Sequence, residues 1–228
     1  MRKIIVGTFV SLDSIMQAPG GPEEDPTGGF KYGGWSTTYW DDVIEKAMGE
    51  TFAEPFDLLL GRKTYDIFAA HWPYVEQDPV ADSFDKLNGD IAKMFNGITK
   101  YVATHHPESL GWVNSEALGD DIPARLHDLK ASDGPTLLVQ GSSELIQILL
   151  EHDLVDEFRL LIYPLVLGEG KRLFGSGTQP VGFKVTKSVV SPSGVILVTY
   201  ERAGGIKTGS FAMENPTEAE LERRRTLS

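Results

Sequence analysis

Cysteine is absent from the 228 residues of this chain. The protein therefore has no disulfide, no thiolate nucleophile and no cysteine-ligated zinc or iron–sulfur site, and this composition fits a reducing, cytoplasmic setting. Long apolar runs are absent too, because no stretch approaches the roughly 18 residues that a membrane-spanning helix needs. The short apolar N-terminal segment is interrupted by Thr8 and Ser11, which indicates a first strand rather than a secretion signal. We expect a soluble protein without a membrane partner.

Basic residues are in the minority, with 21 Lys and Arg against 33 Asp and Glu, which gives a net charge of -12. Such a chain has no long-range attraction for nucleic acid, so an anionic ligand has to be held by local groups. The five histidines show no metal-ligand spacing, and we expect no metal site. The length and the 41% hydrophobic content suit one domain with a full core.

Apolar periodicity and turn residues predict alternating strands and helices. After the first strand, a further strand is expected over Phe56 to Leu60, and others over Lys100 to Ala103 and Thr136 to Gln140. Helices are expected over Asp41 to Ala53, Lys63 to Ala70, Val80 to Phe95, Ile122 to Ala131 and from after Gly141 to about His152. This alternation predicts an α/β fold whose sheet is largely parallel.

The last third of the chain has a different pattern. Two β-rich runs are joined by Ser191-Pro192-Ser193-Gly194, which is typical of a hairpin turn, so antiparallel strands are expected to finish the sheet. We place the domain at 1–202 and a polar tail at 203–228. Asn215-Pro216, the acids after it and three arginines near the end would suit a short helix; the tail is interpreted as mobile or as an oligomer contact.

Two expected strands run into a glycine and then into hydroxyl-bearing residues at a helix start, in "LLLGRKT" and "TLLVQGSSEL". A helix N-terminus attracts anions, and Arg62 and Lys63 add charge to the first of them. Two such sites at one sheet edge suit a cofactor that contains a pyrophosphate. The alternative is that Ser142 and Ser143 only cap a helix and that the two cations are solvated. Neither a Walker A loop nor a G-x-G-x-x-G fingerprint is present.

The segments "RKIIVGTFVSLD", "LLLGRKTYDIF", "KYVATHH" and "TLLVQGSSELIQILLEHDLVDEFRLLIYPLVLGEGKRLF" resemble the dihydrofolate reductase-like superfamily. Within it they are most similar to the reductase (C-terminal) domain of the bifunctional riboflavin-biosynthesis deaminase-reductase and its stand-alone relatives. The resemblance covers most of Arg2 to Arg202. It implies a mixed sheet with helices on both faces, reduced NADP (NADPH) across the strand ends, and a homodimer.

The resemblance also implies roles for individual residues. Gly61, Arg62 and Thr64 match the positions that hold the cofactor's phosphates, and Lys63 is an extra cation. The other positions matched to the cofactor are Thr104 and His105, beside the adenosine ribose phosphate, and Gly141, Ser142, Ser143, Glu144 and Leu145, under the pyrophosphate.

On the substrate side, Ser11 to Asp13 and Trp35-Ser36 match family positions around the nicotinamide and the substrate. Asp13 and Gln140 are our candidates to orient the acceptor. Trp35 and Tyr39 are candidates to cover it, and Asp41 is a further substrate candidate. Each of the four orienting and covering residues could equally be a turn cap or a core residue. The Gly- and Pro-rich loop from Gln17 to Trp35 is long enough to serve as a lid.

Two departures from the riboflavin reductases concern the substrate. Those enzymes usually have an acid where this chain has Gln140, and arginines where it has Asp41 and Asp42. The two aspartates predict a neutral or cationic substrate, because carboxylates repel a phosphate.

The sequence predicts an NADPH-dependent reductase that transfers hydride to a small heterocyclic (pterin- or pyrimidine-like) or carbonyl substrate. It would be related to 5-amino-6-(5-phosphoribosylamino)uracil reductase of riboflavin biosynthesis. The alternative is a non-catalytic NADP(H)-binding or sensor protein of the same fold.

Overall fold

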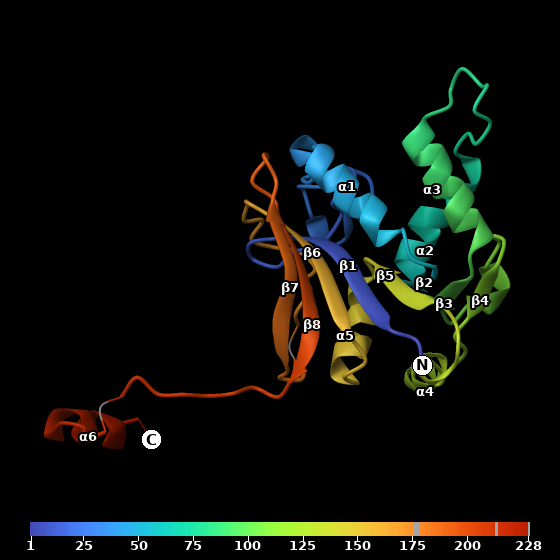
Figure 1. The fold of residues 1–228 in the computed structure, drawn as a ribbon. Coiled ribbons are helices and arrows are strands. Elements are labelled where there is room, and N and C mark those ends of the chain that lie inside the picture. The colour runs from blue at the N-terminus through green and yellow to red at the C-terminus, as the bar shows by residue number, and fades with distance from the viewer. Residues whose placement is uncertain (176–177, 213, 228) are drawn as a thin grey trace.

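One mixed sheet organises the chain in the computed structural model, which describes residues 1–175, 178–212 and 214–227 (Figure 1). The described strands lie in the order β4-β3-β2-β5-β1-β6-β8-β7. Their bounds are β1 Ile4–Ser11, β2 Phe56–Gly61, β3 Lys100–Ala103, β4 Ser115–Ala117, β5 Thr136–Gln140, β6 Glu157–Tyr163, β7 Gly182–Val190 and β8 Ile196–Gly204.

The strands from β4 to β6 pair in parallel, whereas β8 pairs antiparallel with both β6 and β7. Sequence analysis predicted this mixed sheet, and the structure confirms it. The parallel strands β2 and β5 contain the apolar runs "LLL" and "LLV", because both faces are covered. All five parallel pairs point their carboxyl ends to the same edge of the sheet, so the segments that follow these strands meet there.

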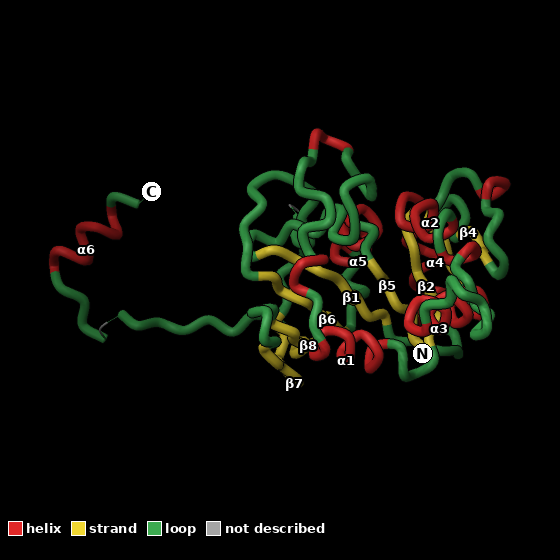
Figure 2. The backbone as a smooth tube through the Cα atoms, turned by 90° about the horizontal axis from the view of Figure 1, so that it is seen from above, coloured by secondary structure: helices red, strands yellow, loops and turns green. Residues whose placement is uncertain are grey.

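Helices cover both faces of the sheet. Their bounds are α1 Asp42–Thr51, α2 Arg62–Ala69, α3 Lys86–Gly97, α4 Ile122–Ala131, α5 Ser143–Glu151 and α6 Glu218–Arg225. Helices α4 and α5 pack their leucines against one face of the sheet, while α1, α2 and α3 pack against the other. Figure 2 shows α1 and α5 on opposite sides of β1 and β6. None of the helices in the described residues is long and apolar enough to span a membrane.

Most of the expected elements are confirmed, and two differences have local causes. The helix expected from Val80 begins only at Lys86, because Asp85 caps it by accepting a hydrogen bond from Asn88 N at 2.8 Å. Strand β4 was not predicted, since three residues carry no usable periodicity.

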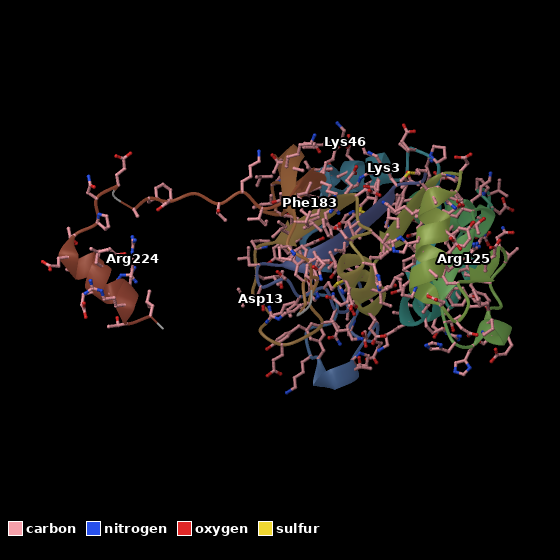
Figure 3. All side chains as sticks on the ribbon, turned by 90° about the horizontal axis from the view of Figure 1, so that it is seen from below. Lys3, Asp13, Lys46, Arg125, Phe183 and Arg224 are labelled. Carbon is pink, nitrogen blue, oxygen red and sulfur yellow. The ribbon has the colours of Figure 1, made fainter. Side chains whose placement is uncertain are left out.

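The C-terminal tail forms the expected short helix, α6, whose first turn is capped by Thr217. Figure 1 shows α6 at the end of an extended segment, away from the sheet, and Figure 3 shows Arg224 on that detached helix. The functional site must therefore be sought in the body of the molecule.

A buried ion pair joins the N-terminus to the sheet. Arg2 and Asp57 form the pair, and only 5% and 9% of their respective surfaces are exposed. The Arg2 guanidinium also donates to Pro135 O at 2.6 Å and lies 5.4 Å from the centre of the Tyr101 ring. Asp57 accepts a second hydrogen bond from Thr99 N at 3.3 Å. These contacts tie the start of β1 to β2, β3 and β5.

Arg2→Met is expected to lower the free energy of unfolding by about 3–5 kcal/mol, because it leaves the Asp57 carboxylate buried without its cation. Urea denaturation measures the loss. The double variant Arg2→Met/Asp57→Asn removes both charges and should recover part of the stability. A loss below about 1 kcal/mol in the single variant, typical of an exposed pair, would contradict the argument.

Candidate functional site

A cavity of about 830 Å³ lies at the carboxyl edge of the parallel strands. We name two sides of it by the helices that form them. The α2–α5 side consists of Gly61, Arg62, Lys63, Thr64, Thr104, His105, His106 and Gly141 to Leu145, and the α1 side consists of Gly7, Phe9, Met48, Thr51, Ile67, Phe68, Trp72, Arg159 and Leu161. Gln140 lines the cavity at the end of β5, and the Gln17–Trp35 loop contributes further residues, among them Glu24 and Asp25.

The α2–α5 side is built from two strand-to-helix turns in direct contact. Gly61 N donates to Ser142 Oγ at 2.8 Å, and a Cβ on Gly61 would lie 3.0 Å from Ser142 Cβ. Gly141 and Ser142 have φ angles of +80° and +69°, a left-handed conformation that turns the chain sharply into α5. Because the Ser142 hydroxyl bonds to Gly61, it bridges the two turns instead of capping α5. The first turns of α2 and α5 therefore meet at one place on the cavity wall.

This arrangement is suited to an anion. The first N–H groups of a helix have no partners within the helix, and the macrodipole adds partial positive charge there. Residues of both first turns line the cavity, from Arg62 to Thr64 and from Ser143 to Leu145. Two such helix starts side by side can hold two linked phosphate groups.

Arg62 spans the gap between α2 and the segment after β3. Its Nε donates to Asp66 Oδ1 at 2.8 Å, and its Nη1 lies 3.3 Å from Thr104 Oγ1 and also donates to Ser109 Oγ. The hydrogen bond to Asp66 raises the pKa of Arg62 above its ordinary value. The guanidinium is thus a fixed positive group at the cavity wall, with 35% of its side chain exposed.

Lys63 and Lys171 converge on one carboxylate of the Gln17–Trp35 loop. Asp25 lies 2.6 Å from Lys171 Nζ and 3.2 Å from Lys63 Nζ, and Thr27 Oγ1 donates to it at 2.5 Å. Burial alone would raise the pKa of Asp25, but hydrogen bonds from Lys171, Thr27 and Lys63 outweigh it and lower the pKa to about 2. An ion cluster therefore fastens this loop over the start of α2.

The loop itself has a compact fold. Trp35 Nε1 donates to Gln17 O at 2.8 Å and so closes the two ends of the loop. The Gln17 side chain donates to Asp25 O and Thr27 O, both at 2.9 Å. A Cβ on Gly33 would lie 2.6 Å from Gly21 O, which shows how closely the two arms of the loop approach. The loop is thus a preformed part of the cavity wall.

The structure brings together every residue that the resemblance assigned to the cofactor. The cavity is lined by Gly61, Arg62, Lys63, Thr64, Thr104, His105 and Gly141 to Leu145, and by the acceptor candidate Gln140.

Asp13 lies elsewhere, at the turn after β1. It accepts hydrogen bonds from Ser11 Oγ at 2.6 Å and from the backbone N–H groups of Leu167 and Gly168 at 3.1 and 2.8 Å. Burial alone would raise the pKa of Asp13, but these hydrogen bonds lower it to about 2. Among the described residues that line the cavity, Asp13 does not appear. Its carboxylate joins β1 to the segment after β6.

The three substrate candidates also have structural partners outside the described cavity lining. Trp35 and Tyr39 pack edge-on against Tyr163, with ring centres 5.0 and 5.6 Å away. Asp41 caps α1 by accepting from Val43 N and Ile44 N, and it accepts from Ser193 N at 3.1 Å. Asp41 therefore caps a helix, and it is absent from the described residues that line the cavity.

Sequence reasoning missed Arg159. This residue belongs to β6, lines the α1 side and donates from Nε to Glu157 Oε1 at 2.6 Å. A charged residue inside the run "FRLLIY", which is otherwise without charge, was a signal that could have found it. Asp25 was missed too, and its position in an irregular loop gave no comparable signal.

The described residues contain no group of three or more His, Cys, Asp or Glu side chains arranged to hold a metal ion.

Comparisons with known proteins identify what this chain is similar to. It is 28% identical over 207 residues to the uncharacterized protein YyaP of Bacillus subtilis (strain 168), a match that covers 89% of this chain and 96% of YyaP. A putative riboflavin biosynthesis protein from Shewanella sp. PV-4 has the same fold, with a TM-score of 0.53 and 22% identity over 88% of this chain and 99% of that one. The dihydrofolate reductase of Enterococcus faecalis, solved with NADP(H) and RAB-propyl, has a TM-score of 0.51 and 14% identity, and the match covers 88% of this chain and 96% of that one.

The sequence model of the RibD C-terminal domain matches residues 2–197, which is most of the chain and includes every strand that contributes to the cavity. The resemblance inferred from the sequence is thereby confirmed, and the chain belongs to the RibD C-terminal domain family.

Proposed function

We propose that this protein is an NADPH-dependent reductase that transfers hydride to a small heterocyclic or carbonyl acceptor. The observation that carries the proposal is the pair of helix N-termini on the α2–α5 side, which Arg62 and Lys63 flank. These helix N-termini and the α1 side line the same cavity. Family membership supports a reductase, and the similarly folded dihydrofolate reductase was solved with NADP(H). The absence of cysteine favours the cytoplasm as its location.

The residues present fit a phosphorylated dinucleotide. Gly61 has no side chain, which leaves room for Ser142 to bring the two turns together. Gly141 lines the cavity beside Thr64, where its backbone allows close approach by a pyrophosphate. The hydroxyls of Thr64 and Ser143 stand at the starts of α2 and α5 and are available as donors. On the other side of α2, Arg62 is the group we assign to the phosphate on the adenosine ribose, together with Thr104 and His105.

When bound, the nicotinamide would supply the hydride, so the chain itself needs only to bind, orient and exclude water. Gln140 lies between the two sides of the cavity, where its amide can orient the acceptor by hydrogen bonds. The Gln17–Trp35 loop covers the cavity and limits the access of water. Asp13 holds its carboxylate ionised against backbone donors, so we assign the proton to water.

Arg62→Ala is expected to weaken NADPH binding by about ten- to hundredfold and NADH binding much less, because a charged hydrogen bond contributes roughly 1.5–3 kcal/mol. Fluorescence titration of the reduced cofactor measures both constants. Arg202→Ala is the matched control, since Arg202 of β8 pairs with Asp153, after α5, and does not line the described cavity. Equal losses for both cofactors in Arg62→Ala would refute the assignment of Arg62.

Asp25→Asn is expected to loosen the Gln17–Trp35 loop, because Lys63 and Lys171 lose their shared anion. Hydrogen exchange of residues 17–35 should then be faster at neutral pH, with Asp128→Asn on α4 as the control. In the unmodified chain the carboxylate has a lowered pKa, so this protection persists above the ordinary value of 3.8 and is lost as the pH falls toward about 2. Unchanged exchange in Asp25→Asn would show that the loop is held by other contacts.

The exposed edge of the sheet supports a homodimer. Strand β7 is an edge strand, and Val185, Val189 and Val190 on it are 54%, 41% and 68% exposed. Such an edge is usually covered by a partner. Light scattering is expected to give about twice the chain mass of 25.1 kDa at micromolar concentration. A mass near that of one chain would reject the dimer.

Turnover decides between this proposal and the non-catalytic alternative. NADPH oxidation is followed with dihydrofolate, pterins, simple carbonyl compounds and the phosphoribosylamino-pyrimidine intermediate of riboflavin biosynthesis as acceptors. Tight NADPH binding without oxidation by any acceptor would favour a cofactor-binding or sensor protein.

A further inference from the structure

The floor of the cavity contains a row of three residues on adjacent strands. Gly7 of β1 is in register with Gln140 of β5 on one side and with Arg159 of β6 on the other. Neighbouring strands are about 4.8 Å apart, and residues paired in this way project to the same face of the sheet. The backbones of Gln140 and Arg159 are therefore about 10 Å apart, and because Gly7 has no side chain, the row leaves an open slot between these two residues.

The walls of this slot are mainly apolar. The next row along the sheet contributes Phe9 and Leu161, which are also in register. Met48 of α1, Phe68 of α2 and Trp72 also line the cavity. The slot is therefore suited to a small, flat molecule.

Arg159 is held rigidly at the edge of the slot. Its Nε donates to Glu157 Oε1 at 2.6 Å, and its Nη1 lies 3.5 Å from Thr51 O, which belongs to α1. Glu157 is only 5% exposed and is absent from the described cavity lining, whereas 29% of the Arg159 side chain is exposed. The guanidinium thus has one edge fixed on a buried carboxylate and retains further N–H groups for the cavity.

Arg159 is also the one cation on the α1 side, counted over the described residues that line it. Asp66, which precedes Ile67 in the cavity lining, is paired with Arg62. A guanidinium presents paired donors that match a carboxylate, and desolvation by apolar walls strengthens such a contact. A charge within a core strand has a high desolvation cost, which is offset when a ligand uses the donors that Glu157 leaves available.

We propose that Arg159 binds an oxyanion of the acceptor, which lies in the slot above Gly7 between Arg159 and the amide of Gln140. The acceptor is then a small, flat molecule that carries a carboxylate or a comparable oxyanion. This inference rests on the proposed reductase function, whose cofactor occupies the α2–α5 side. An anionic acceptor thus takes the place of the neutral or cationic substrate expected from Asp41 and Asp42, because neither residue lines the described cavity.

Two matched probes test the charge preference. Pterin-6-carboxylate and 6-hydroxymethylpterin are flat heterocycles that differ in the charge of one substituent. Their dissociation constants are measured by fluorescence titration of the full chain saturated with NADP⁺, which prevents turnover. The unmodified chain is expected to bind the carboxylate at least about tenfold more tightly, and Arg159→Gln should abolish this preference.

Two further variants separate the slot from the charge. Gly7→Ala is compatible with the fold, since the added Cβ would meet only Leu138 Cδ1 at 3.7 Å within 4 Å. It narrows the slot and is expected to weaken both probes by the same factor. Arg202→Gln removes a guanidinium outside the cavity and should leave both constants unchanged.

The outcomes distinguish this inference from the proposed function. Three results obtained while NADP⁺ still binds would overturn the role of Arg159 alone. They are equal affinity for the two probes, no binding of either probe, and an unchanged preference in Arg159→Gln. Failure of NADP⁺ to bind the unmodified chain would contradict the proposed function and this inference with it.

Discussion

The site depends on the hydrogen bond from Gly61 N to Ser142 Oγ, which joins the two strand-to-helix turns. Strands β2 and β5 are neighbours, so their carboxyl ends are already adjacent. The left-handed conformation of Gly141 and Ser142 then turns the chain so that the serine hydroxyl reaches the other turn. Because of this contact, two helix N-termini form one continuous electropositive wall. The remaining features of the cavity are arranged around that wall.

The two cations near this wall are held in place by carboxylates of the same chain. Arg62 contacts Asp66, and Lys63 contacts Asp25 of the Gln17–Trp35 loop. Each cation therefore has a defined position before any ligand arrives, which reduces the entropy lost on binding. A phosphate bound at this wall would share Lys63 with Asp25. The Gln17–Trp35 loop and the cationic wall are therefore coupled through the Asp25 carboxylate.

Much of this could be predicted from the sequence, because local signals and global fold agree where strands, glycines and helix starts alternate. The turns at Gly61 and Gly141 were found in this way, and so were the strands that bring them together. The substrate candidates were harder. Trp35, Tyr39 and Asp41 were read from their positions in the chain, but their partners Tyr163 and Ser193 are far away in sequence. Arg159 reaches the cavity only through its register with Gly7, which no local pattern contains.

The most direct test of the account is a crystal structure of the protein with NADP⁺. The account predicts the pyrophosphate between the first turns of α2 and α5, in contact with Thr64 and with the backbone of Gly141 to Ser143. It also predicts the phosphate on the adenosine ribose within hydrogen-bond distance of Arg62, and the nicotinamide directed toward Gly7 and the α1 side. A dinucleotide bound elsewhere on the protein, or one whose phosphates leave both helix N-termini uncontacted, would contradict the account.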